Sequence, residues 1–362
     1  MYKKFFMGIA AMAALTLVSC SSDDLNSLSD NSSKHEAISF DGYLGRSAVA
    51  VNGSRGSVET KNQLKTDGFG VFGNYSAGGQ NFGSNLFNNV KVYSSSTADP
   101  VKWEYDNTKY WPTEGHIDFL AYAPYADKTA LNTTLDGKMT SCINFTVENT
   151  VTKQKDLLWA NAKDQTKAKN SGTNKVELTF KHALAKIGYT VKLKQTYSNA
   201  TITLKKITLA GSADEKTNAF YTAGTIDLSR PSSTDLWTPS STAAKQNFKW
   251  FSGTQDLGTT DYPNPATDYL FVIPQDFSKS TAEGGTKADK LFVIVEYTIK
   301  YTKHIDGEMA EMTSTVSSPI EKNFEQGKAY TINLTIGLSP IEFNAEVNEW
   351  ENGTAIPEIP ME

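Results

Sequence analysis

Residues 328–338 read KAYTINLTIGL, and this stretch carries the pattern that decides the fold. Tyrosine, isoleucine and leucine occupy the even positions from 330 to 336, whereas threonine and asparagine occupy the odd positions between them. Successive side chains of a strand point to opposite faces, so this period of two gives one apolar and one polar face. Such a division is typical of an antiparallel strand that covers a core on one side.

The same alternation recurs along most of the chain. It is found at residues 69–75, 117–119, 143–147, 176–180, 187–193, 202–209, 293–301 and 341–347. Turn-forming clusters rich in Gly, Pro, Asn and Ser separate these runs. Helical periodicity is almost absent after the first twenty residues. Many short strands with such breaks predict an all-β chain built from antiparallel β-sandwiches.

Length and composition set the limits of the assignment. The chain has 362 residues, so two domains are expected on a prior of about 150 residues each. We place them at residues 37–183 and 184–362. The formal net charge of −5 gives no basic footprint, so no nucleic-acid partner is expected. Two cysteines exclude a cysteine-rich zinc or iron–sulfur site.

The N-terminus has the features of an export signal. Within residues 1–19, two lysines precede an apolar run that is short for a membrane span. The run ends in LVSC at residues 17–20, which resembles a bacterial lipobox and implies acylation of Cys20. Residues 20–36 are polar and suit a tether between the lipid and the body. The alternative is an ordinary secretory signal with an incidental cysteine.

Motifs of catalysis and cofactor binding find no support. GFGVFG at residues 68–73 has the spacing G-x-G-x-x-G, but the following residues cannot open the helix that a dinucleotide site needs. The four histidines lack metal-ligand spacing, and no G-x-S-x-G is present. Cys142 lies in an apolar alternation and reads as a small core residue. We therefore expect no enzyme, no catalytic residues, no cofactor and no metal.

Aromatic residues gather between residues 103 and 125. Two interpretations stay open for this cluster: a core layer of a sandwich, or an exposed platform on which a sugar stacks. The cluster comprises Trp103, Tyr105, Tyr110, Trp111, Tyr122 and Tyr125.

Several segments together resemble the fimbrillin-like (Mfa-like) surface lipoproteins that build type V pili. They are LVSC with its polar tether, ISF (38–40), GFGVFGNY (68–75), KYWPTEGHIDFLAYAPYA (109–126), LTFKHALAKIGYTVKL (178–193) and FEQGKAYTINLTIGLSPIEFNAEVNEW (324–350). The resemblance implies two transthyretin-like sandwiches in tandem and a non-enzymatic role in pilus assembly and adhesion. It also implies a location at the cell outer membrane and in the fimbrium. The implied partners are other fimbrial subunits, the outer membrane through the lipid anchor, and a host protein or glycan.

The resemblance further implies assembly by strand exchange. In that family an Arg-specific protease removes an N-terminal strand, and a neighbouring subunit donates a strand to the groove. Ile38 and Phe40 have the spacing of the removable strand, and Arg55, or else Arg46, is the candidate cleavage site. Both arginines equally fit ordinary loop residues. The candidate donor strand carries Ile341, Phe343, Ala345 and Val347, which also suit a strand of the protein's own second sandwich.

A second function remains open beside the pilus subunit. It is a surface lipoprotein that does not polymerise and that binds a glycan or host ligand through the aromatic cluster. Exposed, coplanar rings would favour this alternative, and buried rings would favour a plain core.

Overall fold

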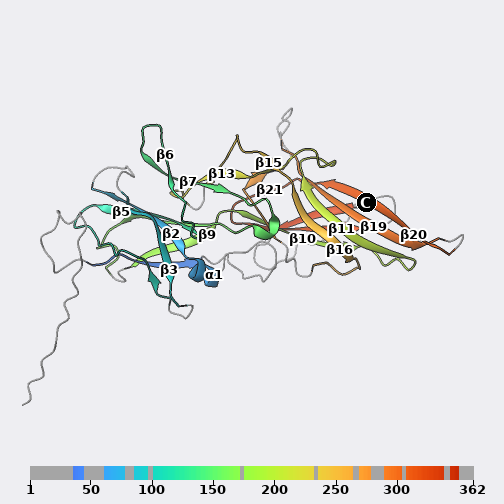
Figure 1. The fold of residues 1–362 in the computed structure, drawn as a ribbon, viewed down its shortest axis with the longest axis horizontal. Coiled ribbons are helices and arrows are strands. Elements are labelled where there is room, and N and C mark those ends of the chain that lie inside the picture. Colours follow the sequence, from blue (N-terminus) through green and yellow to red (C-terminus); the bar gives the residue numbers. More distant parts are fainter. Residues whose placement is uncertain are drawn as a thin grey trace, which may run out of the picture. The chain divides into compact units, whose positions relative to one another are not determined.

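The structure is a computed structural model that describes residues 36–44, 61–77, 85–96, 101–171, 175–231, 235–263, 269–278, 289–303, 307–337 and 343–349. Residues from Ala37 onward form one compact unit. Its elements are almost entirely strands, which confirms the all-β sandwich prediction (Figure 1). Within the described ranges, no helix has the length and apolar character needed to cross a membrane.

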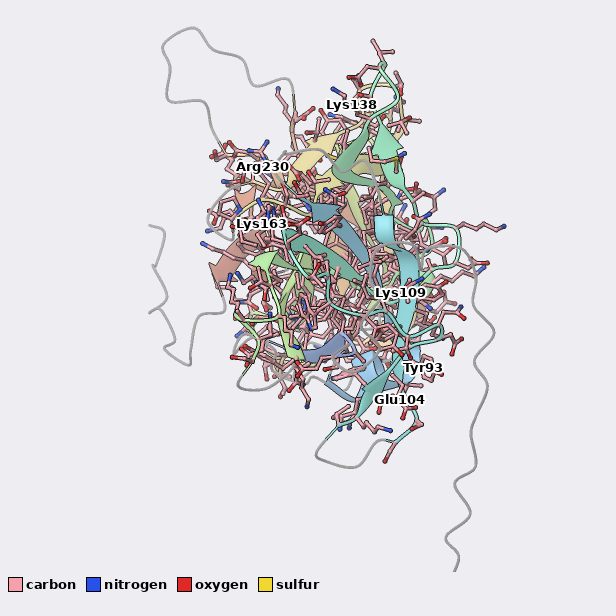
Figure 2. All side chains as sticks on the ribbon, turned by 90° about the vertical axis from the view of Figure 1, so that its left-hand side faces the viewer. Tyr93, Glu104, Lys109, Lys138, Lys163 and Arg230 are labelled. Carbon is pink, nitrogen blue, oxygen red and sulfur yellow. The ribbon has the colours of Figure 1, made fainter. Side chains whose placement is uncertain are left out.

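The N-terminal half is dominated by one seven-stranded sheet with the order β1-β9-β8-β5-β2-β3-β4. Its strands are β1 (Ser39–Leu44), β2 (Phe69–Ser76), β3 (Asn85–Ser94), β4 (Trp103–Glu104), β5 (His116–Ala123), β8 (Leu158–Gln165) and β9 (Lys175–His182). The GFGVFG stretch lies in β2 and the turn before it, so it is a strand and not a dinucleotide loop. At one edge Tyr93 pairs with Glu104, and Figure 2 shows these two residues close together.

A single short α-helix, α1 (Lys61–Asp67), precedes β2 in the part of the chain described here and packs beside β3. A 3₁₀ turn follows later at Val151–Lys153. Seven residues show too little periodicity to be recognised in a sequence. The helix was therefore not predicted.

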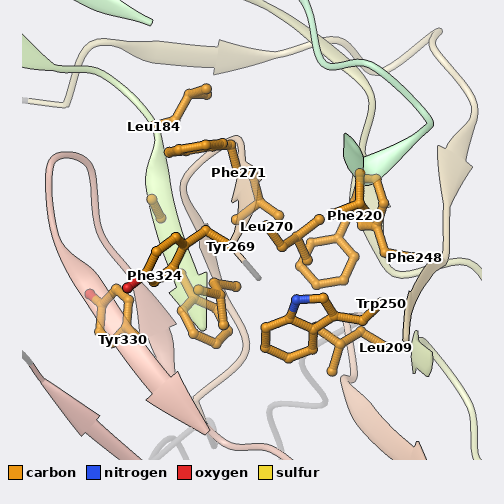
Figure 3. Close-up of a cluster of buried hydrophobic side chains, with 14 of the residues drawn as sticks. Leu184, Leu209, Phe220, Phe248, Trp250, Tyr269, Leu270, Phe271, Phe324 and Tyr330 are labelled. Atoms are coloured by element: carbon orange, nitrogen blue, oxygen red, sulfur yellow. The ribbon is translucent and has the colours of Figure 1, made fainter. Parts of the chain in front are cut away.

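The C-terminal half contains two four-stranded sheets. One has the order β17-β10-β22-β23 and the other β16-β11-β19-β20. Their strands are β10 (Ala185–Leu193), β11 (Ala200–Ala210), β16 (Phe248–Asp256), β17 (Leu270–Val272), β19 (Phe292–Thr302), β20 (Met309–Pro319), β22 (Ala329–Ile336) and β23 (Phe343–Glu349). Tyr189 of β10 packs edge-on against Trp250 of β16, with ring centroids 4.8 Å apart, so the sheets share a core. Figure 3 shows side chains of both sheets in this cluster, among them Trp250 of one sheet and Leu270 and Tyr330 of the other.

Another four-stranded sheet crosses the predicted boundary at residue 183/184. Its order is β14-β13-β7-β6. The strands are β6 (Leu131–Thr133), β7 (Met139–Thr146), β13 (Ala223–Asp227) and β14 (Trp237–Pro239). Two short pairs complete the fold: β12 (Phe220–Tyr221) with β15 (Lys245–Gln246), and β18 (Gln275–Asp276) with β21 (Asn323–Phe324). Because β7 pairs with β13, the halves exchange main-chain hydrogen bonds, and the division into two domains stays a prediction.

Buried apolar residues form two clusters. The first lines the inner face of the seven-stranded sheet and includes residues from β1 to β9, and the second continues from the other face of that sheet through the C-terminal half. Two strand pairs in these regions are parallel, namely β1 with β9 and β10 with β22. Period-two alternation is the same in both pairing modes, so the sequence pattern does not reveal which strands are parallel.

Candidate functional site: the edge strand β1 and its groove

Strand β1 forms one edge of the seven-stranded sheet and runs parallel to β9. The register places Ser39 opposite Lys175 and Leu44 opposite Phe180. Alternate residues of this segment point into the core, because Ile38, Phe40 and Gly42 are buried. The predicted removable strand is therefore a real strand with a defined inward face.

The other side of β1 is also hydrogen-bonded, at its N-terminal end. The backbone N–H of Ile38 donates to the carbonyl of Lys109 at 2.8 Å, and the Tyr105 hydroxyl donates to the carbonyl of Ile38 at 2.7 Å. An antiparallel bridge joins Ala37 to Tyr110. Burial raises the pKa of Tyr105, although its hydrogen bond with the Lys109 backbone acts in the opposite direction. Strand β1 thus fills a gap between β9 and the segment that follows β4.

Phe40 anchors β1 in an aromatic pocket. Its ring centroid lies 5.4 Å from that of Phe87, 5.7 Å from Tyr105 and 5.3 Å from Phe119, and all three contacts are edge-on. Only 2% of Phe40 is exposed. Edge-on aromatic pairs add about 0.5–1.5 kcal/mol each beyond the burial of area. Phe40 is accordingly the best-packed side chain of the strand.

The next inward position is closed to larger side chains. A Cβ added to Gly42 would lie 3.0 Å from Cε1 of Phe69 and 3.5 Å from Cε2 of Phe180. The 3.0 Å approach is tighter than nine in ten real Cβ contacts, so the Phe69 ring would have to shift by a few tenths of an ångström. The groove beneath β1 therefore takes up two large buried side chains, Ile38 and Phe40, and then leaves little room at Gly42.

Removal of β1 would uncover this groove. Burying a side chain of the size of Ile or Phe contributes about 1.5–3 kcal/mol, so Ile38 and Phe40 together contribute about 3–6 kcal/mol. The ion pair of Asp41 with Lys175, at 3.8 Å, is half exposed and adds little. Without β1, β9 would also present an unpaired edge, which is a ready template for another strand. Strand β1 is therefore held in place by the burial of its inward side chains and by its main-chain hydrogen bonds to β9.

Three other predicted site residues lie outside the described residues. They are Cys20, Arg46 and Arg55. Ile341, the first residue of the predicted donor strand, also lies outside the described residues. Both arginines fall, in sequence, between the end of β1 at Leu44 and the start of α1 at Lys61. Cleavage at either one would separate β1 from the rest of the chain.

The rest of the predicted donor strand is β23, at the edge of a C-terminal sheet. It pairs antiparallel with β22, with Phe343 opposite Ile336, Ala345 opposite Leu334 and Val347 opposite Ile332. Within one molecule, this segment is therefore a strand of the protein's own C-terminal half, which was the alternative to a donor strand. Whether it is also donated stays a prediction.

The aromatic cluster does not form a platform. Trp103, Trp111 and Tyr122 are buried, and Tyr105 is partly buried against Phe40. Tyr110 is the most exposed of the six rings, at 51%. The core interpretation accounts for most of the cluster.

Cys142 and His182 lie in surroundings that suit a structural role. Cys142 is half-buried in β7, where burial and the nearby Asp227 raise the pKa of its thiol and keep it protonated. A thiol in that state is a poor nucleophile. His182 forms a hydrogen-bonded pair with Asp156, whose side chain is 1% exposed. Such a buried pair fits a structural role.

The model of the fimbrillin-like family matches residues 57–350. The chain belongs to the fimbrillin-like family. A crystal structure of a fimbrial protein from Bacteroides vulgatus is similar to this fimbrillin-like chain, with a TM-score of 0.59 and 22% sequence identity. The alignment covers 88% of this chain and 99% of that one, which supports the same fold.

Two further solved structures are similar over most of their length. A cell adhesion protein from Bacteroides uniformis, described as putative in its name, has 18% identity and a TM-score of 0.44 and covers 83% of this chain and 97% of its own. The tip fimbrial protein Mfa3 from Porphyromonas gingivalis has 12% identity and a TM-score of 0.33, and the alignment covers 78% of this chain and 94% of that one. No curated protein matches this sequence. Membership in the fimbrillin-like family supports a fimbrial or adhesive role at the cell surface.

Proposed function

We propose that this chain is a non-enzymatic fimbrial subunit or tip adhesin that assembles by proteolytic removal of β1 and donation of a strand from another subunit. Family membership supports the fimbrial part of this proposal. The groove beneath β1 supports the exchange part, because an incoming strand would restore the ladder on β9 and refill the pockets with alternate side chains.

The observation that carries the proposal is a match between the two ends of the chain. Residues 38–44 read ISFDGYL and residues 341–347 read IEFNAEV. In both, the sequence I-x-F is followed by a small residue and then by an aliphatic one, always at alternate positions. An alanine Cβ at the position of Gly42 would require only a small shift of the Phe69 ring. The C-terminal segment therefore fits the groove of a second copy, or of a related subunit, in the direction of β1.

The remaining steps are supported by the N-terminal sequence and by the strand exchange that the family resemblance implies. Acylation at Cys20 would hold the precursor at the outer membrane, since each buried methylene of an acyl chain contributes about 0.8 kcal/mol. Cleavage after Arg55 or Arg46 would leave β1 with the tether and release the body for polymerisation. Among the described residues, no exposed aromatic platform marks a place for a host protein or glycan.

A peptide-binding experiment tests the exchange without relying on mutant folding. The purified full chain is cleaved with a trypsin-like, Arg-specific protease, and a fluorescent peptide of residues 340–348 is added. We expect the cleaved chain to bind the peptide and the intact chain not to bind it. A peptide with Ala345→Leu should bind about 5- to 100-fold more weakly, because overpacking costs about 1–3 kcal/mol. Anisotropy measures both affinities.

The matched control is a peptide with Asn344→Ser, which changes an outward position. It should bind like the natural peptide. If the cleaved chain fails to bind the natural peptide, or binds the Ala345→Leu peptide equally well, the donor role of this segment is wrong. Variants Arg55→Ala and Arg46→Ala of the full chain then identify the cleavage site by N-terminal sequencing of the released body.

A further inference from the structure

Strands β5 and β8 are neighbours in the seven-stranded sheet, and they bring together a histidine and two aspartates. His116 and Asp118 are separated by one residue in β5, and they alternate with Ile117 and Phe119, which are fully buried. The period of two therefore places His116 and Asp118 on the same face of the sheet, away from that core. Both side chains are partly exposed.

A bulge in β8 adds the third residue. Ile117 pairs with Gln165 and Phe119 with Ala162, so β8 has more residues than β5 in this interval. Asp164 lies within it and has a φ of 53°, which is uncommon for a residue other than glycine. Its backbone N–H donates to Oδ1 of Asp118 at 2.7 Å. Bulges commonly redirect a side chain in this way.

The three side chains are close enough to bind one ion. Nε2 of His116 lies 3.7 Å from Oδ1 of Asp164, and one ligand atom from each of the three residues lies within 4.8 Å of the others. Zinc–ligand bonds of about 2.0–2.2 Å require ligand atoms about 3–4 Å apart. Asp164 is 80% exposed, so a modest rotation of its side chain closes the remaining distance.

Among the described residues, no lysine or arginine lies at ion-pair distance from Asp118 or Asp164. The basic group recorded beside them is His116, whose Nε2 lies 3.7 Å from Oδ1 of Asp164. Lys163, which precedes Asp164 and is labelled in Figure 2, makes no ion pair with either carboxylate. A cation bound between the two carboxylates would interact favourably with both.

We propose that His116, Asp118 and Asp164 form a binding site for a zinc ion. One imidazole and two carboxylates are a donor set for zinc and related transition metals, whereas calcium and magnesium prefer oxygen ligands alone. The open side of the sheet leaves further coordination positions for water. The bound ion links β5 to β8 at the bulge, and it therefore stabilises the sheet that also holds β1.

Calorimetric titration of the purified, tag-free full chain with zinc chloride at pH 7.5 tests the site. We expect one ion per chain. His116→Ala and Asp164→Ala should each weaken binding at least about tenfold, since even the outer-shell partners of metal ligands carry about 10–100-fold in affinity. Cobalt serves as a spectroscopic probe, and its visible absorption should disappear in His116→Ala. Calcium at equal concentration should not displace zinc.

The control variant is Asp214→Asn, which removes an exposed carboxylate in a distant turn and should leave zinc binding unchanged. A scan of thermal unfolding should show that zinc raises the melting temperature of the natural chain and not that of Asp164→Ala. Absence of zinc binding, or binding that survives in both site variants, would overturn the proposal. Asp164 is largely exposed, so its variant should fold normally.

Discussion

His182 and Asp156 form a buried pair at the end of β9. Nδ1 of His182 lies 2.5 Å from Oδ2 of Asp156, and the two side chains are 16% and 1% exposed. Burial by itself lowers the pKa of His182, but the charge of Asp156 and their hydrogen bond outweigh it, so the pKa is raised. Lys186 opposes the charged form, and its own pKa is lowered by burial.

This pair makes the stability depend on pH. A histidine whose pKa is raised in the folded state contributes stability that is fully present below its unfolded pKa of about 6.5. The contribution is lost as pH rises through the folded pKa. We expect the pair to contribute more to the free energy of unfolding, measured with denaturant, at pH 5.5 than at pH 8.5.

Asp156→Asn should abolish that pH difference, and it should cost about 3–5 kcal/mol at pH 5.5, as removal of one member of a buried pair does. An unchanged pH profile in this variant would contradict the assignment.

At the scale of elements, the shallow position beneath β1 can be tested within the intact chain. Gly42→Leu should lower the free energy of unfolding by about 1–3 kcal/mol, because its side chain would collide with Phe69. Tyr43→Leu is the matched control, since Tyr43 is 41% exposed and points to the other face. It should change stability by no more than about 0.5 kcal/mol. If both variants lost the same free energy of unfolding, the position of Gly42 would not select against large side chains.

Elements with strict alternation were predictable, and their partners were not. The runs around Phe69, Ile187 and Tyr330 are strands β2, β10 and β22, as the period of two indicates. Nothing in that period shows that β10 lies parallel to β22, or that β7 leaves the first half to pair with β13. Pairing depends on which faces can be buried together, and this is decided by the whole chain.

At the scale of the whole molecule, the shared sheet joins the two halves. Ile226 of β13 is fully buried and pairs with Ile143 of β7. Ile226→Asp should therefore cost at least about 3 kcal/mol, because it buries a charge without a partner. Differential scanning calorimetry should show one transition for the natural chain and one, at lower temperature, for this variant.

Thr225→Asp is the control for the shared sheet. Its hydroxyl donates to Asn144 at an exposed place, so the change should be small. Two separate transitions, of which Ile226→Asp lowers only one, would show that the halves unfold independently.

The candidate sites differ in how far the sequence could foresee them. Ile38 and Phe40 were identifiable because their spacing is local. The spacing of His116 and Asp118 was equally visible, but Asp164 comes from another strand and reaches them only through the bulge in β8. A histidine and an aspartate two residues apart in a strand are common and do not by themselves indicate a metal site. The third ligand could be identified only from the fold.

The parallel pairing of β1 with β9 also bears on how the molecule folds. Ser39 pairs with Lys175, so β1, the first strand that the structure describes, has no partner until the chain has been made as far as β9. Closing so long a loop costs entropy before any contact compensates for it, and such non-local pairs form slowly. We therefore expect the ladder of β1 on β9 to form late in folding. Until it forms, β9 has an unpaired edge with which a strand of another chain can pair.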